Sequence, residues 1–353
     1  MYLNGIGTAS PPARYTKLEC WEAFRHSEWF ERLSERTRAL ARAILLSENG
    51  MDARRLAVGS LAEAFRIDPD TLHRRFLDTA PRLAARAGAC ALDNAGLEAP
   101  DIDAVLVSTC TGYLCPGLSG YVIERLGLRT STLAFDLVGQ GCAAALPNMQ
   151  LGRALLGAGQ NCRNVLSICV EISSAAMYLD DDAGVMVSAC LFGDGAGAAV
   201  LSNSAAAGRR RVFWQDSESL LDPTRREALM FEQRAGMLRN VLTRPVPDLA
   251  AKYVGQVLEV VLGRARLGLP QIRAWIMHAG GREVLRALEQ RLGLGPEDLR
   301  YSAKVLREYG NLSSAFVYFV LQAALADAAA GGWWWLGSFG AGFSCHGALL
   351  KVD

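Results

Sequence analysis

Apolar residues recur at helical spacing through much of the first hundred positions. The stretches 22–46 and 68–95 place them three and four residues apart, and Asp78 and Thr79, just before Pro81, offer a helix start. One short strand-like piece precedes these stretches. The pattern predicts a helical lead-in at the front of the chain.

From position 102 the pattern changes to short apolar runs that alternate with helical segments. Glycine and other turn residues separate the runs. The predicted strands are 104–110, 132–142 with its glycine-rich end, and 164–172; the predicted helices between them are 117–128 and 142–158.

The alternation returns in the second part of the chain. A helical turn and a buried strand are predicted in 187–202, and the polar segment 209–226 follows as a boundary between two halves. The predicted helices beyond it are 249–269, 281–294 and 311–330, and the predicted strands are 273–280 and two more in 333–352, around a glycine turn.

Strands that alternate with helices predict an α/β fold with a mostly parallel sheet and helices on both faces. We expect two similar halves, 1–205 and 206–353, packed through their apolar helices. The run 311–330 is long enough to suggest a membrane span, but Gln322 and Asp327 interrupt it. We therefore expect a buried core helix there and no membrane span.

The charges of the chain nearly cancel, because 37 Lys and Arg residues stand against 36 Asp and Glu residues. A net charge of +1 gives no general attraction to nucleic acid, which is therefore not an expected partner. The nine cysteines form no CxxC pair of the zinc-ribbon kind, so no metal site is expected. Free thiols, and a start with neither a basic nor an apolar signal region, predict a cytoplasmic protein.

The sequence GQGCAAALP places Cys142 at the junction between a predicted strand and a predicted helix. Backbone N–H groups at a helix start favour negative charge, so the pKa of this thiol is expected to be lowered. Gly139 and Gly141 permit a tight turn that presents the side chain. The position suits a nucleophile, although a cysteine there is also common as a small core residue.

Two more polar residues stand at element junctions. His278 follows a predicted strand and precedes two glycines, and Asn311 stands at a predicted helix start, where it also suits an N-cap. Together with Cys142 they form a chemically coherent set. A thiolate accepts an acyl group, an imidazolium stabilises that thiolate, and His and Asn donors hold the oxygen of a developing enolate.

Five motifs together resemble the type III polyketide synthases, the chalcone synthase-like group of the thiolase-fold condensing enzymes. They are GQGCAAALP around Cys142, CLFGDGAGAAVL around Phe192, WIMHAGG around His278, YGNLSSA around Asn311 and SFGAGF around Gly340. They stand in the family's order over about residues 100–353, whereas the first hundred residues match loosely. The resemblance implies a thiolase-like fold, layered α/β/α/β/α, and a homodimer.

The resemblance also implies an activity. An acyl-CoA starter would load onto Cys142, malonyl-CoA would extend it by decarboxylative condensation, and the product would cyclise to a resorcinol, phloroglucinol or pyrone. His278 and Asn311 would activate the thiol and polarise the malonyl thioester, and Phe192 would be the gate between a CoA tunnel and the cavity. CoA thioesters would be substrates, and no cofactor is implied.

Other residues are assigned by the resemblance alone. Cys115 would occupy the position from which the family reaches into the neighbouring subunit, and the small side chains around the cavity would leave room for a long or bulky starter. The residues assigned to substrate binding are Cys110, Thr111, Cys115, Ser173, Ala175, Ala176, Arg239, Ser313, Gly340 and Ala341.

The chain departs from the family pattern in two places. Ala341 replaces the proline of the family's GFGPG closing loop, which gives a looser turn. Arg239 stands about where a second gate aromatic is expected, which suggests a polar or carboxylate-bearing substrate. Candidates for the CoA phosphates, with a solvated helix face as the alternative, are Arg36, Arg38 and Arg42.

Three alternatives stay open. A ketoacyl-acyl carrier protein synthase III-like enzyme shares a Cys, His and Asn set, but it would carry HQAN-like residues where this chain has HAGG. A thiolase or hydroxymethylglutaryl-CoA synthase would need a second Cys or a Glu acting as acid or base. A catalytically inactive homologue acting as a subunit partner would not need the intact set.

Overall fold

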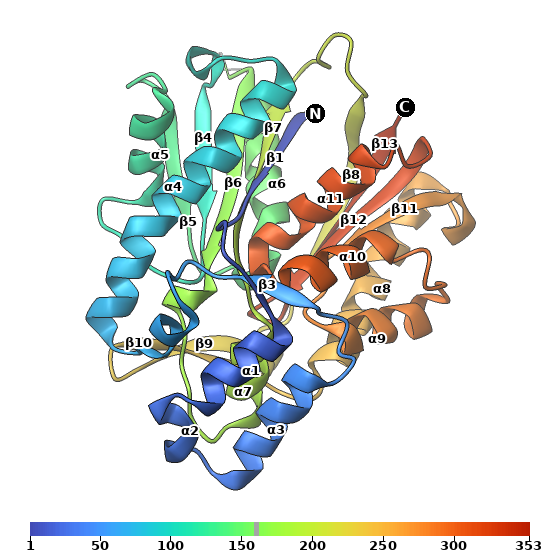
Figure 1. Ribbon diagram of the computed structural model, residues 1–353. Coiled ribbons are helices and arrows are strands. Elements are labelled where there is room, and N and C mark those ends of the chain that lie inside the picture. Colours follow the sequence, from blue (N-terminus) through green and yellow to red (C-terminus); the bar gives the residue numbers. More distant parts are fainter. Residues whose placement is uncertain (159–161) are drawn as a thin grey trace.

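The computed structural model describes residues 1–158 and 162–353, which form a mixed nine-stranded sheet covered by helices (Figure 1). The strand order is β11-β12-β13-β8-β1-β7-β6-β4-β5. The bounds are β1 Tyr2–Ala9, β4 Ala104–Ser108, β5 Leu133–Leu137, β6 Asn164–Ile172, β7 Asp194–Ser202, β8 Val212–Leu221, β11 Ile272–Met277, β12 Gly332–Gly340 and β13 Ser344–Val352.

The prediction of a mostly parallel sheet is wrong. β4 runs parallel to β5 and β6, and β11 runs parallel to β12, but the other neighbouring pairs are antiparallel. β12 and β13 are joined by a tight turn, and an antiparallel pair needs no helical crossover. Strands that follow one another without a helix between them can pair antiparallel, so fewer neighbouring strands of this sheet are parallel than predicted.

The polar segment 209–226 contains β8, which lies in the middle of the sheet. The two sides of the sheet meet there through a single residue pair, Tyr2 with Phe213. A half-boundary at 205/206 stays a prediction.

The helices form three layers around the two parts of the sheet. α4 (Pro69–Ala95) packs on β1, β6 and β7. Beside it, α5 (Leu118–Leu126) packs on α4, β4 and β5. α6 (Ala145–Gly157) and α11 (Phe316–Ala326) contact strands of both parts, and α8 (Val246–Ala265) packs on β8 and β13. This order gives the α/β/α/β/α layering. The remaining helices are α1 Lys17–Arg25, α2 Glu28–Arg32, α3 Glu35–Leu46, α7 Ala183–Leu191, α9 Arg282–Leu292 and α10 Arg300–Tyr309.

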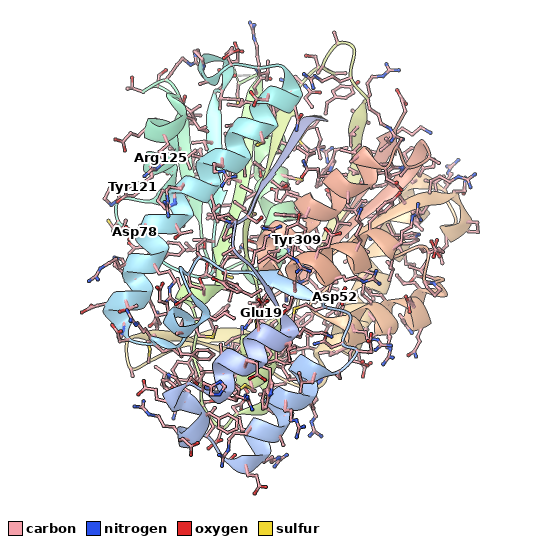
Figure 2. All side chains as sticks on the ribbon, viewed as in Figure 1. Glu19, Asp52, Asp78, Tyr121, Arg125 and Tyr309 are labelled. Carbon is pink, nitrogen blue, oxygen red and sulfur yellow. The ribbon has the colours of Figure 1, made fainter. Side chains whose placement is uncertain are left out.

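Two short ribbons lie outside the main sheet. β2 (Arg14–Thr16) pairs with β3 (Ala53–Arg55), and β9 (Leu229–Arg234) pairs with β10 (Met237–Leu242). β3 contacts α10, and Asp52 N donates to Arg307 O over 2.9 Å; Figure 2 labels Asp52 and Tyr309 in this region. The N-terminal lead-in is thus tied to the C-terminal half.

The helical lead-in differs in detail from its prediction. The predicted helical stretch 68–95 is confirmed as α4, but the start offered at Asp78 and Thr79 is wrong. The helix begins at Pro69, because the Asp68 side chain accepts from Thr71 N and a proline suits the first helical position. Pro81 lies buried inside α4. The stretch 22–46 is divided among α1, α2 and α3 at Ser27 and Ser34, whose extended backbones precede new helices.

The expectation for the apolar run near the C-terminus is confirmed. α11 lies inside the core, with most of its residues buried. Among the residues described, no helix combines the length and the apolar character that crossing a membrane requires.

Candidate active site

Cys142 lies in a 3₁₀ turn, Gly141–Ala143, between β5 and α6. Gly139 and Gly141 have φ angles of +83° and +54°, which confirms the predicted glycine-dependent turn. The Cys142 side chain is buried, with 8% of its surface exposed.

The closing loop lies directly behind this turn. A Cβ atom on Gly340 would stand 2.6 Å from Ala143 N, and Ser338 Oγ donates to Ala143 O over 3.1 Å. Ala341 approaches Gly141 in the same way. Gly340 and Ala341 therefore support the Cys142 turn from behind and are absent from the lining of the pocket described below.

Ser313 connects the Cys142 turn to its surroundings. Its Oγ lies 3.3 Å from Cys142 Sγ and 3.4 Å from both Cys110 Sγ and Glu171 Oε1. Ser313 has a φ of +51°, a left-handed backbone that costs energy in a residue other than glycine. Its amide N–H donates to Asn311 Oδ1 over 2.8 Å, which holds that backbone in place.

Glu171, at the end of β6, is a site residue that the sequence interpretation missed. It is fully buried, and it accepts hydrogen bonds from Cys110 N over 3.1 Å, from Thr111 Oγ1 over 2.9 Å and from Ser314 Oγ. Burial raises the pKa of its carboxyl. The signal was available, since Glu171 is the one charge in the apolar strand NVLSICVEI.

Asn311 lies beside the predicted gate. A β-bridge pairs it with Phe192, and its Nδ2 donates to Gly280 O over 3.3 Å, two residues beyond His278. The structure thus brings the Asn311 and His278 segments together. The predicted N-cap contact with Ser313 is also present.

His278 lies at the carboxyl end of β11, where its N–H donates to Gly337 O over 2.9 Å. Its ring stands edge-on to Phe316 and Phe339, with centroids 5.3 and 5.0 Å away. Within the described part of the chain, Nδ1 is buried and has no hydrogen-bond partner. Burial lowers the pKa of His278 to about 3, so the imidazole is neutral at physiological pH.

The expectation of a lowered cysteine pKa is wrong for this substrate-free state. Burial raises the pKa of Cys142 to about 12, against the opposing effect of the hydrogen bond from Ser313. Desolvation therefore outweighs the helix-start effect. Burial therefore favours the neutral thiol of Cys142 and the neutral imidazole of His278 over the thiolate and imidazolium.

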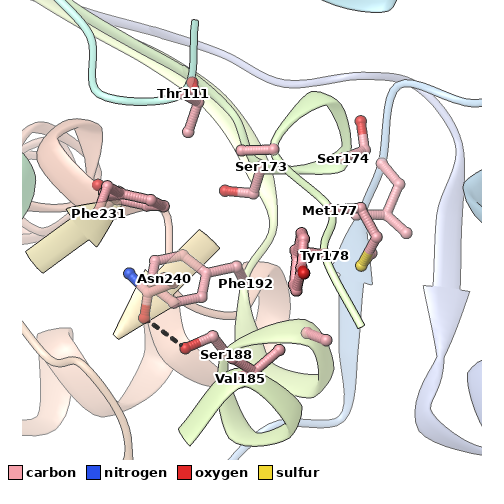
Figure 3. Close-up of a pocket in the computed structure, with 14 residues that line it drawn as sticks. Thr111, Ser173, Ser174, Met177, Tyr178, Val185, Ser188, Phe192, Phe231 and Asn240 are labelled. Carbon is pink, nitrogen blue, oxygen red and sulfur yellow. Dashed lines mark hydrogen bonds between the residues drawn. The ribbon is translucent and has the colours of Figure 1, made fainter. Parts of the chain in front are cut away.

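A pocket opens beside this cluster (Figure 3). Phe192, Phe231, Tyr178 and Met177 supply apolar walls, and Asn240 faces the same space with its side chain bonded to Ser188 over 2.7 Å. No charged side chain is among its lining residues in the described chain. The predicted cavity residues that line it are Thr111, Ser173, Ala176, Ser313 and the predicted gate Phe192.

Three other predicted positions lie elsewhere. Ala175 is buried in a 3₁₀ turn after β6, and Cys110 lies between Glu171 and Ser313. Cys115 is exposed.

Arg239, assigned to substrate binding by the resemblance, does not line the pocket. Its guanidinium is held by Asp180 at 2.8 Å, by Glu232 at 3.1 Å and by Asp182 at 3.5 Å. Asn240, the next residue, lines the pocket instead, opposite Phe231 on the paired strand β9. Phe231 supplies the second aromatic wall that the sequence interpretation took to be absent.

The basic residues of α3 divide into two groups. Arg38 and Arg42 line a surface groove with Trp21 and Phe30, and the Arg38 guanidinium lies 5.0 Å from the Phe30 ring centre. Arg36 is not part of that groove.

Comparison with known proteins gives consistent matches over the whole chain. The family described as FAE1/type III polyketide synthase-like protein matches residues 38–215, and the family described as chalcone and stilbene synthases, C-terminal domain, matches residues 223–352.

Two relatives are similar in sequence. A 1,3,6,8-tetrahydroxynaphthalene synthase of Streptomyces peucetius subsp. caesius is 32% identical over 321 residues, which cover 90% of this chain and 83% of the relative. A 3,5-dihydroxyphenylacetyl-CoA synthase of Amycolatopsis orientalis is 31% identical over 238 residues, which cover 67% and 64%.

Two solved structures share the fold. PKS-I of the brown alga Ectocarpus siliculosus has a TM-score of 0.89 and 26% identity, with 99% of this chain and 98% of that chain covered. The tetrahydroxynaphthalene synthase of Streptomyces coelicolor A3(2) has a TM-score of 0.89 and 24% identity, with 99% of both chains covered.

Proposed function

The chain belongs to the type III polyketide synthases, which are condensing acyltransferases, and we propose that Cys142, His278 and Asn311 carry its chemistry. The observation that supports this most is their convergence beside a pocket without charged walls. The Cys142 turn, the end of β11 and the bridge at Asn311 are linked through Ser313 and Gly280.

In the proposed loading step, Cys142 attacks the thioester carbonyl of an acyl-CoA starter. Because burial favours the neutral thiol and the neutral imidazole, the proton must move during attack. In this proposal the His278 imidazole reaches the thiol, acts as the base and returns the proton to the departing CoA thiolate. Ser313 donates to the sulfur and stabilises the charge that develops there.

In the extension step, malonyl-CoA loses CO₂ and leaves an enolate of its thioester. Asn311 Nδ2 and His278 donate to the enolate oxygen, and the enolate carbon attacks the acyl group on Cys142, which expels the thiolate. No carboxylate base takes part. Glu171 instead fixes the hydroxyl groups and the Cys110 amide around the reacting sulfur.

The proposed substrates are an uncharged acyl-CoA starter and malonyl-CoA. The aromatic and small polar lining of the pocket offers no cation for a carboxylate, and Arg239 is already neutralised by three acidic groups. The proposed product is a cyclised resorcinol, phloroglucinol or pyrone. The relatives' names, a tetrahydroxynaphthalene synthase and a dihydroxyphenylacetyl-CoA synthase, are compatible with hydroxylated aromatic products.

The CoA phosphates are proposed to bind the α3 groove. Arg38 and Arg42 line it with two aromatic side chains, which suit a phosphorylated nucleotide. Arg36 is not included. The free thiols of all nine cysteines favour a reducing compartment, and we propose the cytoplasm.

The enzyme is proposed to act as a homodimer through the β5 edge. β5 is the last strand of the sheet, and the apolar side chains exposed there and nearby are Leu133, Phe135, Val138 and Tyr113. An unpaired apolar strand edge favours pairing with another chain. Cys115, also exposed, lies near Tyr113 in sequence and would face the second copy.

The experiment that tests the function is incubation of the purified protein with malonyl-CoA and a panel of uncharged and carboxylate-bearing acyl-CoAs. Product masses give the starter and the number of extensions. We expect condensed products from uncharged starters. Release of CoA without any condensed product from every starter would contradict the proposal and favour an inactive homologue or another condensing reaction.

A further inference from the structure

Arg54, in β3, is a buried cation that forms no salt bridge with the residues described. Burial opposes its charge, but the Cys20 and Cys190 thiols and Asp194 favour it, so its pKa is raised. Only 6% of its surface is exposed, and an arginine remains charged at any physiological pH. Within the residues described, its guanidinium donates to two main-chain carbonyls, Ala189 O and Phe192 O, and its Nε has no partner. Burying a charge outside a salt bridge is costly, so its placement calls for a reason.

The two carbonyls belong to the end of α7. The last carbonyls of a helix have no partner within the helix, and a positive charge there is favoured by the helix dipole. Arg54 occupies two of them, and Asn311 N–H donates to a third, Leu191 O, over 2.9 Å. The end of α7 is therefore closed by one arginine and by the backbone of Asn311.

The same segment carries the predicted gate. Phe192 follows α7 directly, its carbonyl lies 3.2 Å from Arg54 Nη1, and it forms the β-bridge with Asn311. Gly193 N–H donates to Asn311 O over 2.9 Å, which completes the bridge. A displacement of the Phe192 carbonyl would thus displace Asn311 as well.

There is little room for this segment to relax. A Cβ on Gly310 would stand 2.5 Å from Leu191 O and 3.4 Å from Arg54 Cβ, and a Cβ on Gly193 would stand 2.2 Å from Tyr309 O. The backbones of β3, of residues 191–193 and of residues 309–311 are therefore in direct contact. From Asn311 the connection continues through Ser313 to Cys142.

We propose that Arg54 is a positioning residue that holds the Phe192 gate and Asn311 in register with Cys142. Among the residues described, Arg54 does not line the pocket, and its guanidinium donates to main-chain carbonyls and not to Cys142. It acts by fixing the α7 carbonyls from which the Phe192–Asn311 bridge extends. The proposal rests on the proposed function, because the bridge matters only if Asn311 acts on the malonyl thioester.

The test compares Arg54→Gln and Arg54→Lys with variants of the adjacent Arg55. Arg55 is a control in the same strand, since its side chain donates to Pro11 O and Pro12 O and stands over the Tyr309 ring, and leaves the α7 carbonyls to Arg54. For each variant we measure kcat and KM for malonyl-CoA, CO₂ released per condensed product, and thermal unfolding.

Arg54→Gln is expected to lower kcat about 100-fold, as a misplaced catalytic group does, with KM changed less than about threefold. It should also release more CO₂ per condensed product, because an enolate formed beside a misplaced gate is lost to protonation. Arg54→Lys, which keeps the charge, should recover part of kcat. Arg55→Gln, which leaves the α7 carbonyls bonded to Arg54, should lower kcat and raise the CO₂ ratio much less than Arg54→Gln does.

An Arg54→Ala variant gives a second measurement, since a small guanidinium ion fits the space left. Restoration of kcat by millimolar methylguanidinium, without restoration by methylammonium, supports the positioning role. Wild-type kcat and CO₂ ratio in folded Arg54→Gln would overturn it, and so would recovery of all Arg54 variants only as unfolded protein. A wild-type enzyme that makes no condensed product would instead refute the proposed function.

Discussion

Two charged residues close to the pocket show opposite solutions to burial. Glu171 is fully enclosed and pairs with no cation among the residues described, so hydroxyl and N–H donors hold it. Burial raises the pKa of its carboxyl against the effect of those hydrogen bonds. Arg239, also mostly buried, meets three carboxylates. The first organises the surroundings of Cys142, whereas the second fastens the β9–β10 ribbon to the segment before α7. Charge near a cavity therefore does not by itself identify a substrate contact.

The largest expected effect comes from removing the buried carboxyl group of Glu171. Glu171→Ala leaves Cys110 N, Thr111 Oγ1 and Ser314 Oγ without their buried acceptor, so we expect a loss of about 4 kcal/mol in the free energy of unfolding. Chemical denaturation at neutral pH measures it. A loss below about 1 kcal/mol would show that water replaces the carboxylate and that the site is not closed.

His346 is a third titratable side chain that is buried, and its Nδ1 lies 2.8 Å from Ser219 Oγ. Burial lowers the pKa of His346 to about 4, below the unfolded value near 6.5, so its contribution to stability is present above pH 6.5 and is lost as the pH falls toward 4. Between pH 7 and pH 4 the wild type should lose about 3 kcal/mol more than His346→Gln does. Parallel stability curves for the two proteins would contradict a buried neutral imidazole.

Replacement of Arg239 should destabilise the protein because the carboxylates around it would then repel one another. Arg239→Gln leaves Asp180, Asp182 and Glu232 close together without their cation, so we expect a loss of about 1 to 2 kcal/mol in unfolding free energy, reduced by added salt. The kcat with an uncharged starter should change less than about threefold. A large fall in activity confined to carboxylate-bearing starters would contradict this expectation and indicate that Arg239 contacts the substrate.

The smallest expected effect is that of Glu171→Gln, which should leave the free energy of unfolding unchanged or raise it slightly. Because the raised pKa of Glu171 makes its ionised form unfavourable in the folded protein, stability falls as the pH rises above the ordinary value of 4.5. Glu171→Gln lacks this titration and should equal or exceed the wild type at pH 8 by up to about 1 kcal/mol. Its advantage should shrink as the pH is lowered to 5. A variant less stable than the wild type at pH 8 would indicate that the carboxylate is well solvated by its donors.

Sequence patterns predicted those parts of the site that depend on local backbone. The glycines beside Cys142 require a turn, and β11 and α9 follow directly from the apolar run before His278 and the stripe after it. The pocket residues Thr111, Ser173 and Ala176 came only through the family resemblance.

The parts that sequence patterns missed depend on contacts between distant segments. The three carboxylates around Arg239 come from other segments, so its side chain alone suggested a free cation. The direction of the Cys142 pKa shift was mistaken because its burial arises from the Ser313 segment and the closing loop, which no local pattern reveals. The central strand β8 was also missed, because its polar sequence suggested a boundary between two halves.

Cys142 is the proposed acyl acceptor, even though burial raises the pKa of its thiol. The direct measurement is the intact mass of the protein after incubation with an acyl-CoA starter, for the wild type, Cys142→Ala and the control Cys110→Ala. We predict one acyl group on the wild type and on Cys110→Ala, and none on Cys142→Ala. An acyl group on Cys142→Ala, or its loss in Cys110→Ala alone, would contradict the account.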